Sequence, residues 1–190
     1  QTGANSRVLE TDGADMAVSG TMYLTQPDGN NMGYTYIRGG ALTAGIMQDA
    51  RDSQYTVNQT GGEVTATQLL ANQGYGGNGG GTSYEQRYIL AGGRLTVAQI
   101  WGGGGGGWNR PISLYLGGGT LRASANQNLD SLNFYLTGTN GNVTIDTQGF
   151  TVNRINYNAI TGTGGLVKAG SGILYLTQAN TYGGQTVVNE

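Results

Sequence analysis

Two pairs of aspartates are the residues of this 190-residue chain whose type and spacing could support a reaction. Asp12 and Asp15 lie three positions apart, and so do Asp49 and Asp52. Paired carboxylates can act as acid and base in the hydrolysis of glycosidic bonds. Both pairs lie among Gly, Ala, Ser and Gln, however, where aspartate ordinarily bonds to nearby backbone in a turn. The pattern favours solvated turn carboxylates over a catalytic pair.

The residues that other catalytic or metal sites would need are missing from the sequence. The chain has no cysteine and no histidine, which excludes thiolate and imidazole metal sites, disulfides and nucleophile–histidine triads. Residues 76–82 resemble a calcium-binding β-roll repeat in glycine content but contain no aspartate. The glycines at 102–107 are not followed by the Lys-Ser or Lys-Thr of a phosphate loop. We predict a protein that is not an enzyme and holds no metal or cofactor.

Aromatic residues occur in two glycine-rich insertions near residues 74–81 and 101–108. Trp101 and Trp108 flank six consecutive glycines, and Tyr75 lies in the earlier insertion. One interpretation is a pair of flexible surface loops. The other is an adhesive or subunit-docking patch, because exposed Trp and Tyr are favoured anchors at interfaces.

Charge and composition narrow the class of protein. Charged residues make up 11% of the chain, the net charge is −2, and Lys168 is its single lysine, so no basic patch for nucleic acid is present. No apolar run reaches the roughly 18–20 residues of a membrane helix. Glycine reaches 37 residues but proline only 2, which excludes collagen. Because the chain opens with Gln1, we expect a removed leader or a fragment.

The elements that carry these residues recur along the chain. Each copy is a short β-like segment, a glycine pair and a second β-like segment. The copies span residues 34–44, 55–66, 88–97 and 114–123, with a looser one at 164–168. The second glycines, Gly40, Gly62, Gly93, Gly119 and Gly165, are separated by 22, 31, 26 and 46 residues. A period of 20 to 31 residues with variable insertions is typical of a solenoid.

Residues after each glycine pair alternate in polarity, as in a strand with one buried face. Leu42 is apolar and Thr43 polar; Leu95, Thr96 and Val97 repeat the pattern. Stacked turns would share a thin core of Leu, Val and Ile, with glycines at the corners. We therefore predict an all-β fold, a single β-solenoid domain over residues 1–190, of about seven to eight coils and about 35 Å long. Asn156, Asn158 and Asn180 are candidates for stacked amide ladders along it.

The C-terminal part resembles a known family. Within residues 162–189 a regularly spaced pattern is formed by Gly165, Leu166, Lys168, Gly170, Gly172, Leu174, Leu176, Asn180, Thr181, Tyr182, Gly184, Thr186, Val188 and Asn189. This pattern is similar to the passenger-associated repeat of bacterial autotransporters. The resemblance implies a right-handed parallel β-helix, secreted or displayed at a bacterial cell surface. The sequence departs from the family pattern at Glu190, where the family usually has glycine. In the family, further coils and a membrane barrel usually follow this position.

Two functions follow from these features. A structural rod could stack end to end into a fibre, because residues 186–189 resemble an uncapped strand and edge-blocking Lys and Pro are scarce. Self-association would then involve Val187 and Val188. The alternative is a monomeric autotransporter-type adhesin passenger that binds a surface or glycan through Tyr75, Trp101 and Trp108. A polysaccharide-active enzyme would need converging carboxylates, which the sequence does not supply.

Overall fold

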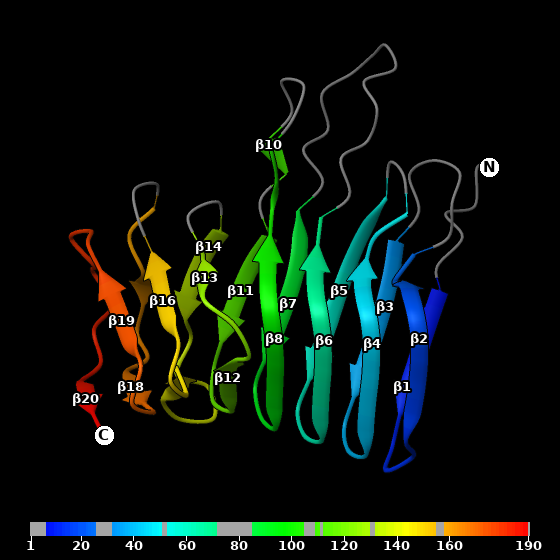
Figure 1. The fold of residues 1–190 in the computed structure, drawn as a ribbon, viewed down its shortest axis with the longest axis horizontal. Helices are drawn as coiled ribbons and strands as arrows, with labels where there is room; N and C mark the ends of the chain where they lie inside the picture. Colours follow the sequence, from blue (N-terminus) through cyan, green and yellow to red (C-terminus); the bar gives the residue numbers. More distant parts are fainter. Residues whose placement is uncertain are drawn as a thin grey trace.

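The computed structural model describes residues 7–25, 32–50, 53–71, 85–104, 109–110, 112–129, 132–154 and 158–189. Within these ranges the chain forms strands and turns and no helix. The strands stack side by side along one axis, with the chain termini towards opposite ends (Figure 1). The predicted all-β solenoid is confirmed.

One long wall of the solenoid is a seven-stranded parallel sheet in the order β1-β3-β5-β7-β11-β14-β17. Its strands are β1 (Arg7–Thr11), β3 (Met32–Ile37), β5 (Gln54–Gln59), β7 (Gln86–Leu90), β11 (Ile112–Leu116), β14 (Leu132–Leu136) and β17 (Thr161–Gly162). Each strand is paired with the strand one turn away and not with the next strand of the chain. This skipping order is that of a solenoid.

The facing wall is an eight-stranded parallel sheet in the order β2-β4-β6-β8-β12-β15-β18-β20. Its strands are β2 (Met16–Tyr23), β4 (Ala41–Gln48), β6 (Glu63–Leu70), β8 (Arg94–Trp101), β12 (Thr120–Ala123), β15 (Val143–Asp146), β18 (Leu166–Ala169) and β20 (Thr186–Val188). The first four strands have eight residues each, and the later ones have three or four.

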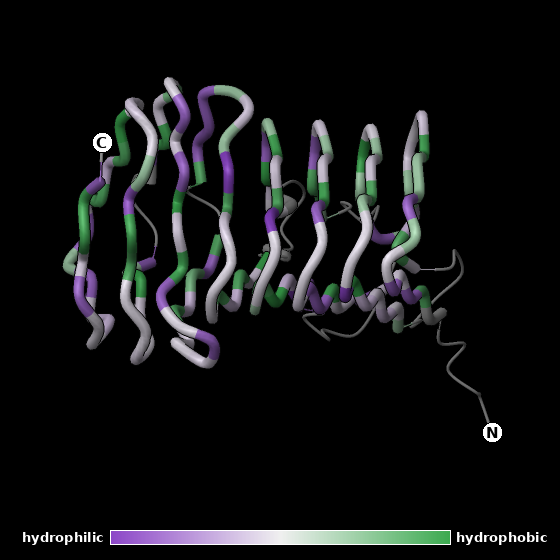
Figure 2. Tube along the Cα trace, turned by 90° about the horizontal axis from the view of Figure 1, so that it is seen from below, coloured by the Kyte–Doolittle hydropathy of each residue, from purple (hydrophilic) through white to green (hydrophobic). Residues whose placement is uncertain are grey.

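A third wall begins where the strands of the eight-stranded sheet become short. It contains β13 (Gln127–Asn128), β16 (Thr151–Arg154) and β19 (Ile173–Leu176) in parallel. The later turns therefore bend twice between walls and enclose a broader section than the earlier ones (Figure 2). A two-residue antiparallel ribbon of β9 (Gly103–Gly104) and β10 (Asn109–Arg110) follows Trp101, the last residue of β8. Residues 72–84, which include the first predicted insertion at 74–81, and residues 105–108 of the second insertion lie outside the described part of the chain.

The number of coils differs somewhat from the predicted seven to eight. Five turns, β3–β4, β5–β6, β7–β8, β11–β12 and β14–β15, are paired on both sides in both long sheets. The end turns are incomplete, because β17 has only two residues and β20 has no counterpart in the seven-stranded sheet. The estimate from length counted these partial turns as whole ones.

Glycines with positive φ form the corner between the two long walls. Gly40, Gly62, Gly93 and Gly119 have φ between 66° and 71° and lie one above another in successive turns. A Cβ on Gly93 would lie 2.3 Å from the carbonyl oxygen of Gly62. Glycine is thus required here both by backbone conformation and by the close approach of the neighbouring turn.

The core is a narrow column of alternating inward residues, as predicted. Leu42, Val64, Leu95, Leu121 and Ile145 occupy one inward register position in five successive strands, and all are buried. The opposite wall contributes larger groups, among them Tyr55, Tyr88 and Phe134, which are almost fully buried. Few apolar residues suffice because each turn covers the next.

Candidate interaction surfaces

The five residues predicted to mediate contacts do not form one surface. Trp101 is 51% exposed at the end of β8, whereas Tyr75 and Trp108 lie outside the described residues. Val187 and Val188, 37% and 65% exposed, lie on β20 at the end of the same sheet. Three strands, β12, β15 and β18, separate β8 from β20. Trp101 and the two valines therefore belong to separate surfaces.

The aspartates have different environments. Asp12 and Asp15 are exposed, and the Asp15 carboxylate accepts a hydrogen bond of 2.8 Å from the Ala41 amide in the next turn. Asp49 was expected to be a solvated turn carboxylate, and this prediction is wrong, because its side chain is completely buried. Asp52 lies outside the described residues. The described aspartates do not converge on a cleft.

Gln86 bonds to Asp49 inside the solenoid. Its Nε2 donates to Asp49 Oδ2 at 3.1 Å and to the carbonyl of Ser53 at 2.8 Å. Its Oε1 accepts a hydrogen bond of 2.7 Å from the Tyr55 amide. Thr25 and Ser53, which are also buried, share a hydroxyl contact of 2.6 Å. Side chains from three successive turns thus satisfy one another, as buried polar groups require.

Two buried tyrosines accompany this network. Burial raises the pKa of Tyr55, and the nearby Asp49 and Tyr88 raise it further. Burial alone raises the pKa of Tyr88, whose hydroxyl donates to Gln59 Oε1 at 2.7 Å. Gln59 in turn donates to the corner carbonyls of Gly61, Gly62 and Arg94. The Tyr55 hydroxyl has no hydrogen-bond partner among the described residues, whereas the bonds of Tyr88 and Gln59 join adjacent turns and add cohesion between them.

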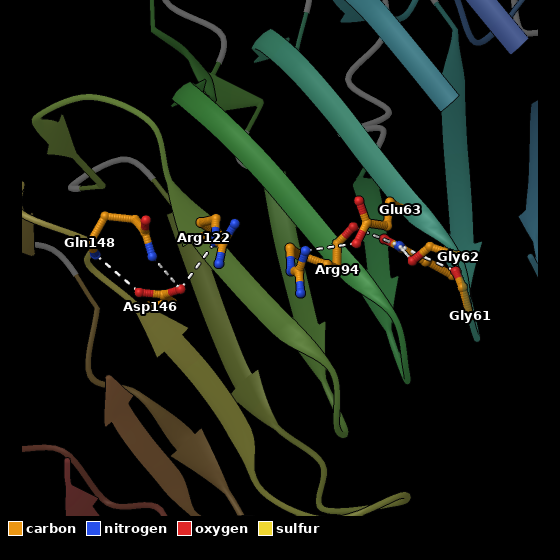
Figure 3. Close-up of polar contacts among 8 residues, drawn as sticks. Gly61, Gly62, Glu63, Arg94, Arg122, Asp146 and Gln148 are labelled. Atoms are coloured by element: carbon orange, nitrogen blue, oxygen red, sulfur yellow. Dashed lines mark hydrogen bonds and ion pairs between the residues drawn. The ribbon is translucent and has the colours of Figure 1, made fainter. Parts of the chain in front are cut away.

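Charged pairs lie on the outer face of the eight-stranded sheet (Figure 3). Arg94 on β8 bonds to Glu63 on β6 at 2.6 Å, and Arg122 on β12 bonds to Asp146 on β15 at 3.0 Å. Burial opposes ionisation of Asp146, but hydrogen bonds from Gln148 and Arg122 lower its pKa. Each pair joins adjacent turns. The charges of these two pairs therefore balance each other on this face.

The outer face of the seven-stranded sheet carries aromatic and amide side chains. Tyr115 on β11 and Tyr135 on β14 stack with ring centroids 4.8 Å apart and planes 19° from parallel. The Tyr115 hydroxyl donates to Glu85 at 3.0 Å. Partial burial opposes ionisation of Glu85, but hydrogen bonds from Ser113, Arg87 and Tyr115 lower its pKa. At the β7 end of the tyrosine stack, Glu85 is therefore already hydrogen-bonded to Tyr115 and to its other neighbours.

An amide ladder runs beside the tyrosines. Asn158 Nδ2 donates to Asn133 Oδ1 at 2.6 Å, and Asn133 Nδ2 donates to the Ser113 hydroxyl at 3.3 Å. Of the three predicted ladder residues, Asn158 takes part; Asn180 instead accepts the Ile160 amide, and Asn156 lies outside the described residues. A hollow of about 280 Å³ lies at the end of the tyrosine stack, lined by Asn133, Phe134, Tyr135, Asn158, Ala159 and Thr161.

The local sequence contains a signal for this surface, separate from the glycine-pair repeats. Tyr115 lies between Leu114 and Leu116, and Tyr135 lies between Phe134 and Leu136. An aromatic residue between two inward apolar residues must point outward. The register that stacks the two tyrosines follows from the pairing of β11 with β14.

Neither a metal centre nor a membrane span is found in the described ranges. No three His, Cys, Asp or Glu side chains gather there as metal ligands. Nor does that part of the structure contain a long apolar helix able to cross a bilayer.

Comparison with known proteins decides the class of the chain. The family model of the passenger-associated transport repeat matches residues 166–190, which include β18, β19 and β20. The chain is 32% identical over 187 residues to an adhesin, the BmaC autotransporter of Brucella suis biovar 1. The chain is an autotransporter passenger-like β-helix protein. As such it is secreted or displayed at the cell surface.

The match to the adhesin covers 98% of this chain but only 4% of that protein. The similarity thus extends from the first turns through the repeat, although the chain spans a small part of its relative. No solved structure matches the chain.

Proposed function

We propose that the chain is a non-enzymatic rod section of an autotransporter-type adhesin passenger. The observation that carries this proposal is the in-register parallel pairing between turns, which continues along both long sheets. Such a stack lengthens by adding turns without changing the existing ones. The similarity of nearly the whole chain to a short part of an adhesin supports the same role. The buried Asp49, bonded to Gln86, is an internal bridge and not a catalytic group.

Surface display tests the adhesive part of this proposal. We expect bacteria that display the chain through a heterologous outer-membrane anchor to be retained on host-cell monolayers several-fold better than bacteria displaying the anchor alone. Protease resistance of the displayed chain would establish that it is folded. Equal retention of the two strains, with folded chain on the surface, would contradict an adhesive role.

A fibre is the second candidate, supported by the edge strand β20. Among the described strands, β20 pairs only with β18, and Val188 on it is 65% exposed. At the other end, β2 pairs with β4 in the same parallel sense. Two copies could therefore continue one parallel sheet from β20 to β2, and such an open contact gives a filament.

Negative-stain electron microscopy of a dilution series tests the fibre. We expect filaments of constant width at high concentration, and Val188→Lys should shift assembly to at least about tenfold higher concentration, because an edge lysine opposes strand pairing. Thr65→Lys is the matched control, because it adds the same charge at an exposed position of β6, in the middle of the rod. Isolated rods at every concentration would contradict the fibre and would be consistent with a rod section of a longer passenger.

A further inference from the structure

We propose that the hollow beside Tyr135 binds one ring of a neutral carbohydrate. This inference deepens the proposed adhesive role by naming a ligand class and a place on the rod. It rests on three properties of the site: one aromatic face, a ladder of carboxamides and a lining without charge.

The aromatic face is produced by the register of the sheet. Tyr115, Tyr135 and Thr161 occupy the same outward position in successive turns. Tyr115 stacks against one side of the Tyr135 ring. On the other side the column continues with the much smaller Thr161, and there the hollow opens. A half-buried ring held by stacking on one face is a rigid apolar platform on the other.

Carboxamides provide the polar half of the site. Asn133 and Asn158 line the hollow and are fixed to each other and to Ser113 by hydrogen bonds across successive turns. A carboxamide has two N–H donors and an acceptor oxygen, so it can bond to a hydroxyl from either side. Asn133 uses one of its two N–H bonds with Ser113. A ligand with an apolar face and a rim of hydroxyls satisfies both halves of the site, and a pyranose ring has this form.

The lining argues against charged ligands. The six residues around the hollow include no Lys, Arg, Asp or Glu. The ion pair of Glu85 with Arg87, at 2.6 Å, belongs to β7 and its preceding residue, on the other side of Tyr115 from the hollow. A phosphate, sulfate or carboxylate would find no opposite charge here. The volume of the hollow, about 280 Å³, lies just below the ~300–1,000 Å³ of sites for larger small molecules. This size fits one sugar ring.

The location of the hollow separates it from the stacking edges. It lies on the lateral face of the seven-stranded sheet, across the pairing of β14 with β17. Further turns would cover β20 at the end of the stack and leave this face open. Because tyrosine and both amides are held before a ligand arrives, binding would order few side chains.

The test is carbohydrate binding by the purified 190-residue chain. A glycan array containing neutral and acidic oligosaccharides selects the probe, and saturation-transfer NMR with the best neutral one measures affinity. We expect binding to neutral glycans. Tyr135→Ala should weaken it at least about tenfold, as expected for an aromatic anchor, and Asn158→Ala should weaken it severalfold. Tyr135→Phe should retain binding, because the ring face persists.

Tyr36→Ala is the matched control, since Tyr36 lies on β3 in the same outward column but far from the hollow. Unchanged affinity in folded Tyr135→Ala, binding confined to acidic glycans, or no binding to any array member would overturn the inference. The measurement uses no cells, so it is independent of the display experiment. Adhesion that persists in a displayed Tyr135→Ala chain without glycan binding would preserve the adhesive role and refute the hollow as its site.

Discussion

Gly93→Ala is expected to lower the free energy of unfolding by about 3 kcal/mol or more, a large fraction of the ~5–15 kcal/mol of a typical domain. Gly93 has φ of 71°, and an added Cβ would lie 2.3 Å from the Gly62 oxygen and 2.6 Å from the Gly61 carbonyl. These are backbone atoms of the adjacent turn, fixed by the hydrogen bond from the Arg94 amide to the Gly62 carbonyl at 3.0 Å. The clash can be relieved only by separating two turns. Denaturant unfolding followed by circular dichroism measures the loss.

Substitutions at two other glycines distinguish the cost of a positive φ from the cost of steric overlap with the neighbouring turn. Gly13 has φ of 88° but open space around its Cβ position, so Gly13→Ala should cost only about 1–2 kcal/mol. Gly20 has open space and no positive φ, and Gly20→Ala should be close to neutral. If Gly93→Ala cost no more than Gly13→Ala, close contact between turns would not be the reason for glycine at the corner.

Gln86→Met should be the next most damaging of the changes considered, at about 2–4 kcal/mol. Methionine has a similar length but cannot donate to Asp49 or Ser53, nor accept from the Tyr55 amide. All three partners are buried, so the lost bonds would not be replaced by bulk water. Most of the lost stability would come from Asp49, because its buried carboxylate would have one hydrogen-bond donor fewer.

Gln99→Met is the matched control. Gln99 also bonds between turns, accepting from Gln68 Nε2 at 2.9 Å, but it lies on the exposed face of β8. Water can replace that partner, so the change should stay within about 0.5 kcal/mol. Similar losses in the two variants, measured by thermal and urea unfolding, would show that the Asp49 network contributes little.

Local patterns were sufficient to predict the walls and corners of this fold. The glycine pairs and the alternation at Leu42 and Leu95 are properties of neighbouring residues, and both depend directly on backbone conformation. The doubled step from Gly119 to Gly165 also has a structural reason. An intervening turn, β14–β15, is present, but the register of β12 with β15 places Asn142 and Val143, and not a glycine pair, opposite Gly118 and Gly119. Asn142 Oδ1 accepts the Gly165 amide at 3.1 Å.

Contacts between distant residues were beyond such patterns. Asp49 resembles a turn aspartate in its local sequence, and its burial depends on Gln86, which is 37 residues away. The hollow beside Tyr135 likewise requires the register that places Thr161 next in the column. Trp101 is exposed, as an adhesive residue would need to be, while its role and those of Val187 and Val188 remain predictions.

The pairing order of the two long sheets also determines how this rod would yield to tension. Each described strand in them is hydrogen-bonded only to strands of the adjacent turns. A pull on the chain at one end would therefore peel off a single turn at a time, and not shear many bonds at once. A turn of 26 residues, such as that from Gly93 to Gly119, would release about 90 Å of chain at ~3.5 Å per residue. Extension in such increments would let the rod absorb mechanical load before the whole fold is lost.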